Sequence, residues 1–257
     1  MKDVQSQQDT RNVYLNRVGI KDLRFPINVA EKEGGHQPTV AKVALSVDLH
    51  ETDRGTHMSR FVESMNTCGV IDPNDTRGFL LDMAERLKAE KAFMKMEFPF
   101  FVFKAAPVSG ILSRLDLDCC ILACVTHGVF DYELSVKVPV TTLCPCSKEI
   151  SDYGAHNQRA LVSVTIRASK KIWIEDLVSL VEACASSDIY SLLKRPDEKF
   201  VTERAYENPK FVEDVTRDVY MRLDAIKDIK SFEVEVESLE SIHNHSAFAS
   251  ASRGREV

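Results

Sequence analysis

The sequence lacks the features that would place the protein in a membrane, in a secretory route or on nucleic acid. No run within the 257 residues approaches the roughly 18 apolar residues that a transmembrane helix needs. The N-terminus has no apolar core of the kind that a signal peptide contains. The formal net charge of −6 offers no basic field to displace counterions from a phosphate backbone. We therefore expect a cytoplasmic protein that has neither a membrane nor a nucleic acid as its partner.

A disulfide framework is also missing from the pattern of cysteines. The chain has seven of them, an odd number, which favours free thiols in a reducing compartment. Four lie inside apolar stretches, where cysteine behaves as a small buried hydrophobe: Cys119, Cys120, Cys124 and Cys184. The chain is long enough to bury a substantial core, so its size alone calls for no disulfide or structural metal.

Two hydrophobic periods alternate along the chain. Alternating apolar residues predict half-exposed antiparallel strands, in runs at residues 43–49, 94–102, 115–121, 132–140, 160–166 and 232–236. Apolar residues at helical spacing predict helices around residues 80–87, 174–181 and 212–223. Asp72-Pro-Asn-Asp75 is a start signal for the first of these helices, and residues 28–37 are expected to form a loop.

The order of these elements is strand, strand, helix, helix, strand, strand, followed by roughly the same series again. It is not the alternation of strand and helix that builds a parallel sheet, so we expect an α+β fold with helices on one face of an antiparallel sheet. We divide it into a flexible N-terminal arm (residues 1–16), a first half (17–126) and a second half (127–257) of one continuous domain. The edges of such a sheet are often covered by another subunit.

The segment from Val138 to Arg159 carries the strongest chemical pattern. Cys144 and Cys146 follow a predicted strand with Pro145 between them, and the polar run behind them predicts a loop, where catalytic groups are common. His156 comes twelve residues after Cys144, far enough for a short excursion to return to its start. A thiolate and an imidazole are a partial ligand set for zinc or a similar metal, and a third ligand is still needed.

Two thiols one residue apart do not easily bind the same tetrahedral metal. We therefore assign Cys144 to the metal and Cys146 to the substrate, where a thiol can donate a proton. The third ligand stays open between many carboxylates and the histidines His50, His57, His243 and His245. One of the last two could instead act as an acid or base near neutral pH.

Two charged segments have ordinary explanations as well as functional ones. Arg54-Gly-Thr-His57-Met-Ser-Arg60 precedes a predicted helix and could bind a phosphate, but a capped helix start with solvated arginines is equally expected. Residues 194–204, taken alone, predict a solvated charged link between two helices.

Five separated motifs together resemble type IB GTP cyclohydrolase I. They are Leu143–Ile150, Gly154–Arg159, Arg54–Arg60, Lys194–Glu198 and Glu240–His245. The resemblance implies a tunnelling fold with two ββααββ-type halves, and a homotetramer whose active sites lie between subunits. It also implies hydrolysis of GTP to 7,8-dihydroneopterin triphosphate and formate, the first step of tetrahydrofolate biosynthesis. The implied cofactor is a divalent metal, zinc or manganese, with iron as a further option.

The resemblance also implies a role for individual catalytic residues. The metal ligands would be Cys144, His156 and Glu198. Cys146 and His243 would transfer protons in the pocket. Glu198 enters the site through the resemblance alone, because its charged surroundings do not distinguish it.

Substrate contacts are implied in the same way. Glu213 would accept two hydrogen bonds from the guanine edge, and Glu240 would be a second pocket carboxylate. The triphosphate would bind basic residues, first of all Arg60 and Lys148, with Arg54, Arg159 and Arg204 as further candidates.

Two alternative functions remain open at this stage. A deazaguanine nitrile reductase of the same fold would use a cysteine nucleophile and a nicotinamide cofactor, and would need no metal. A non-catalytic module would close a structural metal site with four protein ligands.

Overall fold

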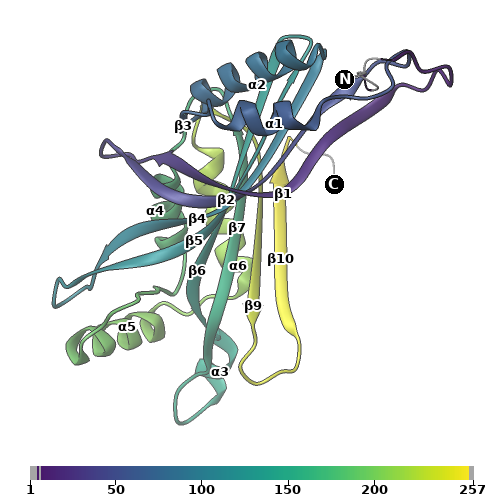
Figure 1. Cartoon of the computed structure of the whole chain (residues 1–257). Coiled ribbons are helices and arrows are strands. Elements are labelled where there is room, and N and C mark those ends of the chain that lie inside the picture. Colours follow the sequence, from purple (N-terminus) through teal and green to yellow (C-terminus); the bar gives the residue numbers. More distant parts are fainter. Residues whose placement is uncertain (1–4, 6, 255–257) are drawn as a thin grey trace. The chain divides into compact units, whose positions relative to one another are not determined.

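The computed structural model describes residue 5 and residues 7–254, which form ten strands and six helices (Figure 1). The strands are β1 (Leu15–Ala30), β2 (His36–Leu49), β3 (Val70–Ile71), β4 (Lys91–Ala105), β5 (Leu112–Thr126), β6 (Val129–Leu143), β7 (Asn157–Ala168), β8 (Ser187–Asp188), β9 (Ile229–Leu239) and β10 (Ser246–Arg253). The helices are α1 (Met58–Met65), α2 (Pro73–Leu87), α3 (Pro145–Ile150), α4 (Ile174–Glu182), α5 (Arg195–Glu207) and α6 (Val212–Asp224). Within the described part of the chain, no helix is both long and apolar enough to cross a membrane.

The chain divides into two compact units. The first contains the residues up to 99 together with 120–134, and the second contains 100–119 together with the residues from 135 onward. Residues of the three long strands β4, β5 and β6 are shared between the units. These units are not the same as the two predicted halves of the sequence, which divide at residue 126. The division into halves stays a prediction.

In the first unit the strands follow the order β3-β1-β2-β4, with β1 and β2 antiparallel over most of their length. Gly19 lies where the β1 backbone approaches β2 too closely for a side chain, because a Cβ atom there would come within 1.9 Å of the Leu45 carbonyl oxygen. Part of the expected arm is held by backbone pairing: Gln8 forms a bridge with Asp53, and the Asp9 amide donates to the Thr52 carbonyl over 2.8 Å. Residues 1–4 and 6 of that arm lie outside the described residues.

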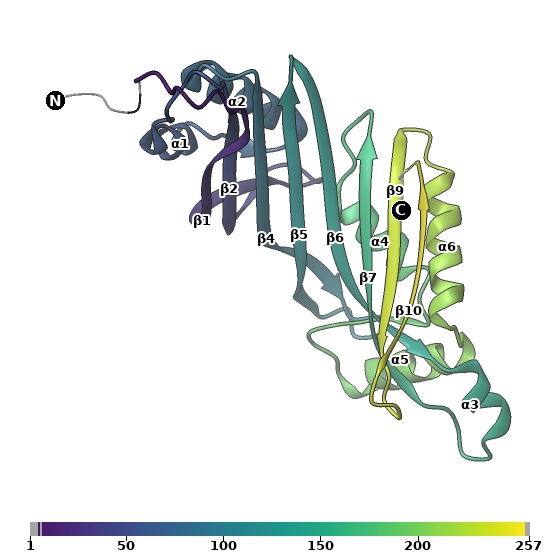
Figure 2. The same cartoon turned by 90° about the vertical axis from the view of Figure 1, so that its right-hand side faces the viewer.

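In the second unit the strands follow the order β6-β7-β9-β10 (Figure 2). The short β8 pairs with β6. Helix α6 packs on β9 and β10. Its apolar stripe, Val212, Val215, Val219 and Leu223, is buried in this contact layer. Strand β10 is the last in the order, so one of its edges carries no further strand within the described chain.

The hydrophobic periods predicted most of these elements correctly. All six alternating runs lie in strands, and the three helical stripes lie in α2, α4 and α6. The start signal before α2 is confirmed, since the Asp72 carboxylate accepts hydrogen bonds from the amides of Asn74 and Asp75 over 2.8 and 2.9 Å. The α+β class with antiparallel strands is confirmed as well.

Three local expectations were wrong. The predicted loop at residues 28–37 is shorter than expected and covers only residues 31–35, because β1 runs to Ala30 and β2 begins at His36. The loop expected after Cys144 contains the short helix α3, and the charged link at residues 194–204 lies largely in α5. Helix α5 escaped detection because only Asp197 and Ala205 are buried on it, so it has no apolar stripe.

Candidate active site

The excursion between β6 and β7 returns to its starting point, as the spacing of Cys144 and His156 predicted. The Cys144 amide donates to the His156 carbonyl over 3.1 Å. Ser147 reinforces this closure, because its hydroxyl donates to the Cys144 carbonyl over 3.1 Å and accepts from the His156 amide over 3.2 Å. One backbone hydrogen bond and two through the Ser147 hydroxyl therefore hold Cys144 and His156 at the same end of the β6-β7 pair.

The side chain of Cys144 is the N-cap of α3. Its sulfur accepts a hydrogen bond from the Ser147 amide over 3.4 Å, and Pro145 occupies the first helical position, where its missing N–H is not needed. The hydrogen bond from the Ser147 amide therefore fixes the position of the sulfur, the atom that would bind a metal.

The imidazole of His156 is oriented through one of its two nitrogens. Nδ1 lies 2.9 Å from Oε1 of Gln158 and 3.4 Å from the hydroxyl of Ser241. These contacts leave Nε2 as the nitrogen that can bind a further ligand.

A cavity of about 230 Å³ in the second unit gathers five of the predicted site residues. They are Cys144, His156, Glu213, Glu240 and His243. These residues come from the ends of β6, β7 and β9, from the first turn of α6 and from the link between β9 and β10. Residues separated by up to about a hundred positions in the sequence therefore meet at one end of this unit.

Further lining residues were not identified from the sequence: Thr142, Gln158, Lys210, Phe211, Val212, Ser238, Ala247 and Phe248. Gln158 could have been found from strand alternation, since positions two apart on a strand face the same side as His156. Of the two C-terminal histidines, His243 lines the cavity. His245 stacks on its ring with the centroids 5.2 Å apart.

Four other predicted residues, Cys146, Glu198, Lys148 and Arg60, are outside the cavity lining. Cys146 is exposed on α3, and Glu198 is exposed on the first turn of α5. The ammonium of Lys148 donates to the Tyr206 carbonyl at the end of α5 over 2.6 Å and lies 4.4 Å from the centre of the Tyr206 ring. Lys148 therefore links α3 to α5.

Arg60 belongs to the first unit, where its guanidinium donates to the Arg86 carbonyl over 3.1 Å. The proposed role of Arg60 in phosphate binding stays a prediction.

Helix α5, which carries Glu198, is anchored at its beginning by Asp197. The fully buried carboxylate accepts hydrogen bonds from the amides of Val108 and Ser109, each over 2.8 Å, from the Ser109 hydroxyl over 2.7 Å and from the Lys194 amide over 2.9 Å. Burial opposes ionisation of this group, but the hydrogen bonds outweigh it and hold the pKa of Asp197 well below its usual range.

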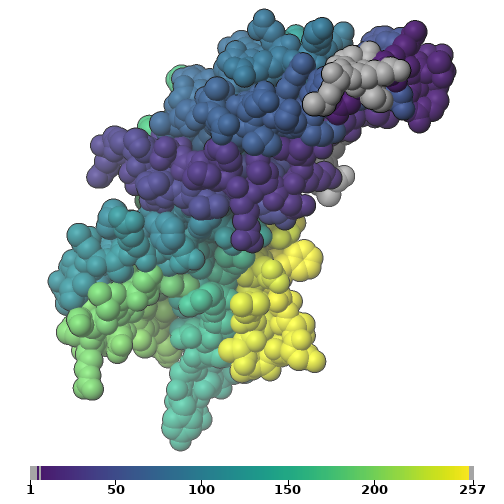
Figure 3. Space-filling view, viewed as in Figure 1, coloured from purple at the N-terminus to yellow at the C-terminus, as the bar shows by residue number. Residues whose placement is uncertain are grey.

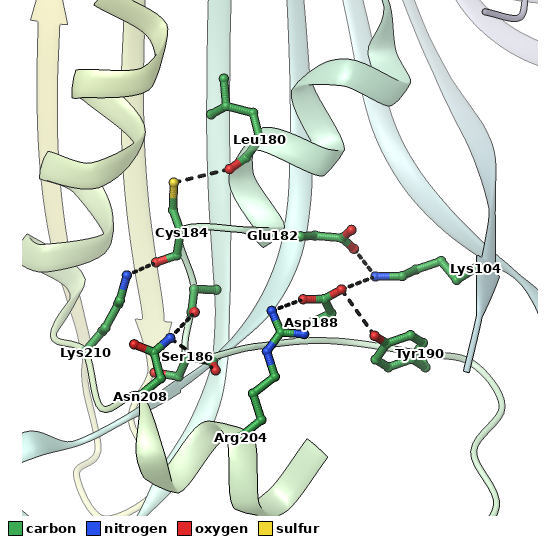
Figure 4. Close-up of polar contacts among 11 residues, drawn as sticks. Lys104, Leu180, Glu182, Cys184, Ser186, Asp188, Tyr190, Arg204, Asn208 and Lys210 are labelled. Atoms are coloured by element: carbon green, nitrogen blue, oxygen red, sulfur yellow. Dashed lines mark hydrogen bonds and ion pairs between the residues drawn. The ribbon is translucent and has the colours of Figure 1, made fainter. Parts of the chain in front are cut away.

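A buried ionic cluster anchors the other end of α5 (Figure 4). Asp188 on β8 accepts from the ammonium of Lys104 over 3.1 Å and from the hydroxyl of Tyr190 over 3.2 Å, and its other oxygen lies 3.5 Å from the guanidinium of Arg204. Lys104 also pairs with Glu182 at the end of α4. Burial raises the pKa of Glu182, and burial together with Asp188 raises the pKa of Tyr190 to about 12.

Two cations of the second unit, Lys210 and Arg204, have protein partners. Lys210, a lining residue, donates to the Cys184 carbonyl over 2.8 Å and to the Asp218 carboxylate over 2.6 Å, and Figure 4 shows the first of these contacts. Arg204, a candidate for phosphate binding, pairs with Asp188.

The donors in the cavity suit a metal such as zinc in part. A cysteine sulfur and an imidazole nitrogen are the soft and borderline ligands that zinc prefers. Among the described residues, however, no three His, Cys, Asp or Glu side chains lie close enough together to hold a metal ion. Cys144, His156 and Glu198 are therefore not gathered within the described chain, and their joint role as ligands stays a prediction.

Comparisons with known proteins identify relatives over nearly the whole length of the chain. A family profile described as "Type I GTP cyclohydrolase folE2" matches residues 1–249. "GTP cyclohydrolase FolE2" of Thermotoga maritima is 54% identical over 254 residues, which cover 99% of this chain and 98% of the relative. The protein of the same name from Dictyoglomus turgidum is 52% identical with the same coverage.

Two solved structures are similar in fold alone. Uricase from Arthrobacter globiformis superposes with a TM-score of 0.51 at 12% identity, over 94% of each chain. Urate oxidase from Bacillus sp. TB-90 has a TM-score of 0.51 at 7% identity, over 95% of this chain and all of the other. These urate oxidases have the tunnelling fold, so the predicted fold class is confirmed.

Proposed function

The chain belongs to the type I GTP cyclohydrolase FolE2 family, and we propose that it hydrolyses GTP to 7,8-dihydroneopterin triphosphate and formate. This reaction would be the first step of tetrahydrofolate biosynthesis, and the subdivision would be type IB, as the sequence motifs suggest. The observation that carries the proposal is the cavity in which Cys144, His156, Glu213, Glu240 and His243 meet. Full-length similarity to named cyclohydrolases favours this function over nitrile reduction and over a structural-metal module.

Cys144 and His156 would hold a divalent metal, zinc or manganese, with iron as a further option. When bound, the metal would supply a water of lowered pKa for attack on the purine. Glu198 is our candidate for the third ligand. Because it stands apart from the other two in the described chain, we propose that the ligand set is completed when subunits assemble.

Assembly into a homotetramer has support from two surfaces of the second unit. Strand β10 ends the strand order and carries the exposed Phe248, so it offers unpaired backbone groups beside the cavity. The segment between β6 and β7 protrudes at the lower end of the space-filling view, and its apolar residues Ile150 and Tyr153 are 84% and 101% exposed (Figure 3). A second copy of the chain would cover such surfaces.

The size and charge of the cavity suit the base of the nucleotide. A volume of about 230 Å³ is below the range of roughly 300–1,000 Å³ that is common for complete ligand pockets. Glu213 would accept hydrogen bonds from N1–H and the exocyclic amine of guanine, a pair of donors that adenine does not present. The triphosphate would then extend out of the cavity toward basic groups, for which Arg60 and Lys148 are our candidates.

Two residues are our candidates for moving protons, one in the cavity lining and one outside it. The imidazole of His243 lines the cavity, and the exposed thiol of Cys146 follows Cys144 by two positions. Protonation of a ring nitrogen by either group would assist opening of the imidazole ring after water attacks C8. A second hydrolysis would release formate, and rearrangement of the ribose followed by ring closure would give the pterin.

The test is a formate assay coupled to metal analysis of the purified protein. Incubation with GTP should yield formate and a product that becomes fluorescent on oxidation, whereas ATP should yield neither. Removal of the metal with a chelator should abolish both signals, and added zinc or manganese should restore them. A metal-loaded protein that releases no formate from GTP, or one that reduces a nitrile with NADPH, would contradict the proposal.

A further inference from the structure

We propose that Gln158 is a positioning residue that keeps His156 in the Nδ1–H tautomer and so directs the lone pair of Nε2 to a metal. The inference deepens the proposed function, because it rests on His156 being a metal ligand. It starts from a chain of hydrogen bonds that joins the imidazole to side chains on neighbouring strands.

The chain of hydrogen bonds crosses three neighbouring strands. His156 Nδ1 lies 2.9 Å from Oε1 of Gln158, and Nε2 of Gln158 donates to the Thr142 hydroxyl over 3.3 Å. The Thr142 hydroxyl in turn lies 3.5 Å from the hydroxyl of Ser238. Gln158 lies on β7, Thr142 on β6 and Ser238 on β9, which are adjacent in the strand order. We call these residues, His156, Gln158, Thr142 and Ser238, the relay.

The orientation of the Gln158 side-chain amide sets the direction of the relay, because the hydroxyls of Thr142 and Ser238 can each donate or accept. If the Gln158 amine faces Thr142, the Gln158 carbonyl faces the imidazole, and an acceptor at that position requires a proton on Nδ1. Nε2 then carries the lone pair. The opposite orientation of the amide would place an N–H against Nδ1 and move the ring proton to Nε2, where it would block a metal.

Burial makes the far end of the relay rigid. Thr142 is 1% exposed and Ser238 is fully buried, so the hydroxyl that contacts the Gln158 amine is held in place on β6. The Ser241 hydroxyl, 3.4 Å from Nδ1, is the other contact of this nitrogen, but it lies on an exposed link between β9 and β10. We therefore assign control of the tautomer to Gln158. A partner that orients a ligating histidine in this way is commonly important for metal affinity.

Four variants separate positioning from packing. Gln158→Leu removes both polar groups at similar size, and Gln158→Glu keeps an acceptor for Nδ1–H while the Thr142 hydroxyl can turn to donate. Thr142→Val removes the acceptor of the Gln158 amine without changing shape. Ser135→Ala is the matched control, because it breaks another side-chain hydrogen bond between β6 and β7, that of Ser135 with Thr165 over 2.8 Å, outside the cavity.

Two measurements are needed, and only one depends on a metal. Zn²⁺ affinity is measured by competition with a chelator. The tautomer of His156 is read from solid-state ¹⁵N spectra of metal-free, histidine-labelled protein at alkaline pH, with His156→Asn used to assign the signal. Leucine at position 158 should weaken Zn²⁺ binding by about 10–100-fold and shift the ring toward the Nε2–H tautomer. Thr142→Val should shift both readouts in the same direction but less.

Gln158→Glu should retain the Nδ1–H tautomer and bind Zn²⁺ at least as tightly as the unmodified chain, and Ser135→Ala should leave both readouts unchanged. If Gln158→Leu gives the same Nδ1–H signal as the unmodified protein, Gln158 does not set the tautomer and the positioning role is overturned. The proposed function would remain intact. Absence of Zn²⁺ binding by the unmodified protein would instead contradict the metal site, and the ¹⁵N spectra would still decide whether Gln158 sets the tautomer. If Ser135→Ala and Gln158→Leu lose equal Zn²⁺ affinity and shift the His156 tautomer equally, the effect comes from strand packing. That result would overturn the inference.

Discussion

Replacing Lys104 with methionine should destabilise the protein, and should do so more at pH 8 than at pH 5. Lys104 is 8% exposed and supplies the ammonium shared by Glu182 and Asp188. It also lies 4.4 Å from the centre of the Tyr190 ring. Methionine keeps most of the volume and the flexible stem of lysine, so the change removes the charge rather than the packing.

The expected loss in the free energy of unfolding depends on the carboxylates that Lys104→Met leaves without their partner. Removing one partner of a buried ion pair commonly costs about 3–5 kcal/mol, because the remaining charge stays buried without compensation. Glu182 is the more affected carboxylate. It is 9% exposed, whereas Asp188 keeps its contacts with Arg204 and Tyr190.

The pH dependence follows from the direction in which the pKa of Glu182 is shifted. Burial already raises the pKa of Glu182 above its ordinary value of 4.5, and Lys104 opposes that rise. Without Lys104 the folded-state pKa should rise further. For a carboxyl group whose folded-state pKa is raised, the linked stability is complete below the unfolded value and is lost as the pH rises through the folded value. The penalty of Lys104→Met should therefore grow between pH 5 and pH 8.

The assay is urea unfolding followed by the fluorescence of the single tryptophan. Trp173 directly precedes α4, the helix that ends at Glu182, so it reports on the affected region. Protein concentration and chelator must be held constant, because assembly and metal binding shift apparent stability. A loss of 3 kcal/mol corresponds to a midpoint lower by about 1 M urea or more.

The double variant Lys104→Met, Glu182→Gln is the control. A neutral amide no longer leaves a buried charge, so this variant should recover much of the stability at pH 8 and lose the pH dependence. The reasoning is refuted if Lys104→Met costs the same at both pH values, or if the double variant is no more stable than the single one.

Three further predictions concern the candidate site. Cys146→Ala should retain bound metal and lower kcat by at least about 100-fold, whereas Cys144→Ala should lose both metal and turnover. The measurement is the metal content per chain of each variant. Equal metal loss in the two variants would contradict the division of roles between the two cysteines. Glu213→Gln should lower kcat/KM for GTP by about 10–100-fold, since it loses one acceptor and removes the charge that strengthens the hydrogen bonds; an unchanged value would exclude Glu213 from base recognition. Asp197→Asn should lower the midpoint of thermal unfolding, because an amide donor would face the Lys194 amide or the Ser109 hydroxyl. It should also reduce metal affinity if α5 positions Glu198. A midpoint equal to that of the unmodified chain would contradict the anchoring role of Asp197.

The strands and helices could be predicted from the sequence where the spacing of apolar residues shows which face is buried. Alternating and helical apolar stripes mark buried faces, so the strands at residues 160–166 and 232–236 and the helix at 212–223 could be recognised from spacing alone. Helix α5 gave no such signal. Its stability comes from contacts at its two ends, those of Asp197 with residues 108 and 109 and that of Arg204 with Asp188, which join residues far apart in the sequence.

The sequence by itself determined the class of fold and the chemical types of the candidate residues, because hydrophobic period and side-chain chemistry are local properties. It also determined that Cys144 and His156 would meet, since a twelve-residue excursion between two strands closes on itself. Only the tertiary structure decided which distant residues share the cavity with them, among them Glu213, Glu240 and His243. It alone brought Gln158, Thr142 and Ser238 into one relay. The reason is physical: strand pairing brings positions from β6, β7 and β9 within hydrogen-bond distance, and no spacing along the chain encodes that register.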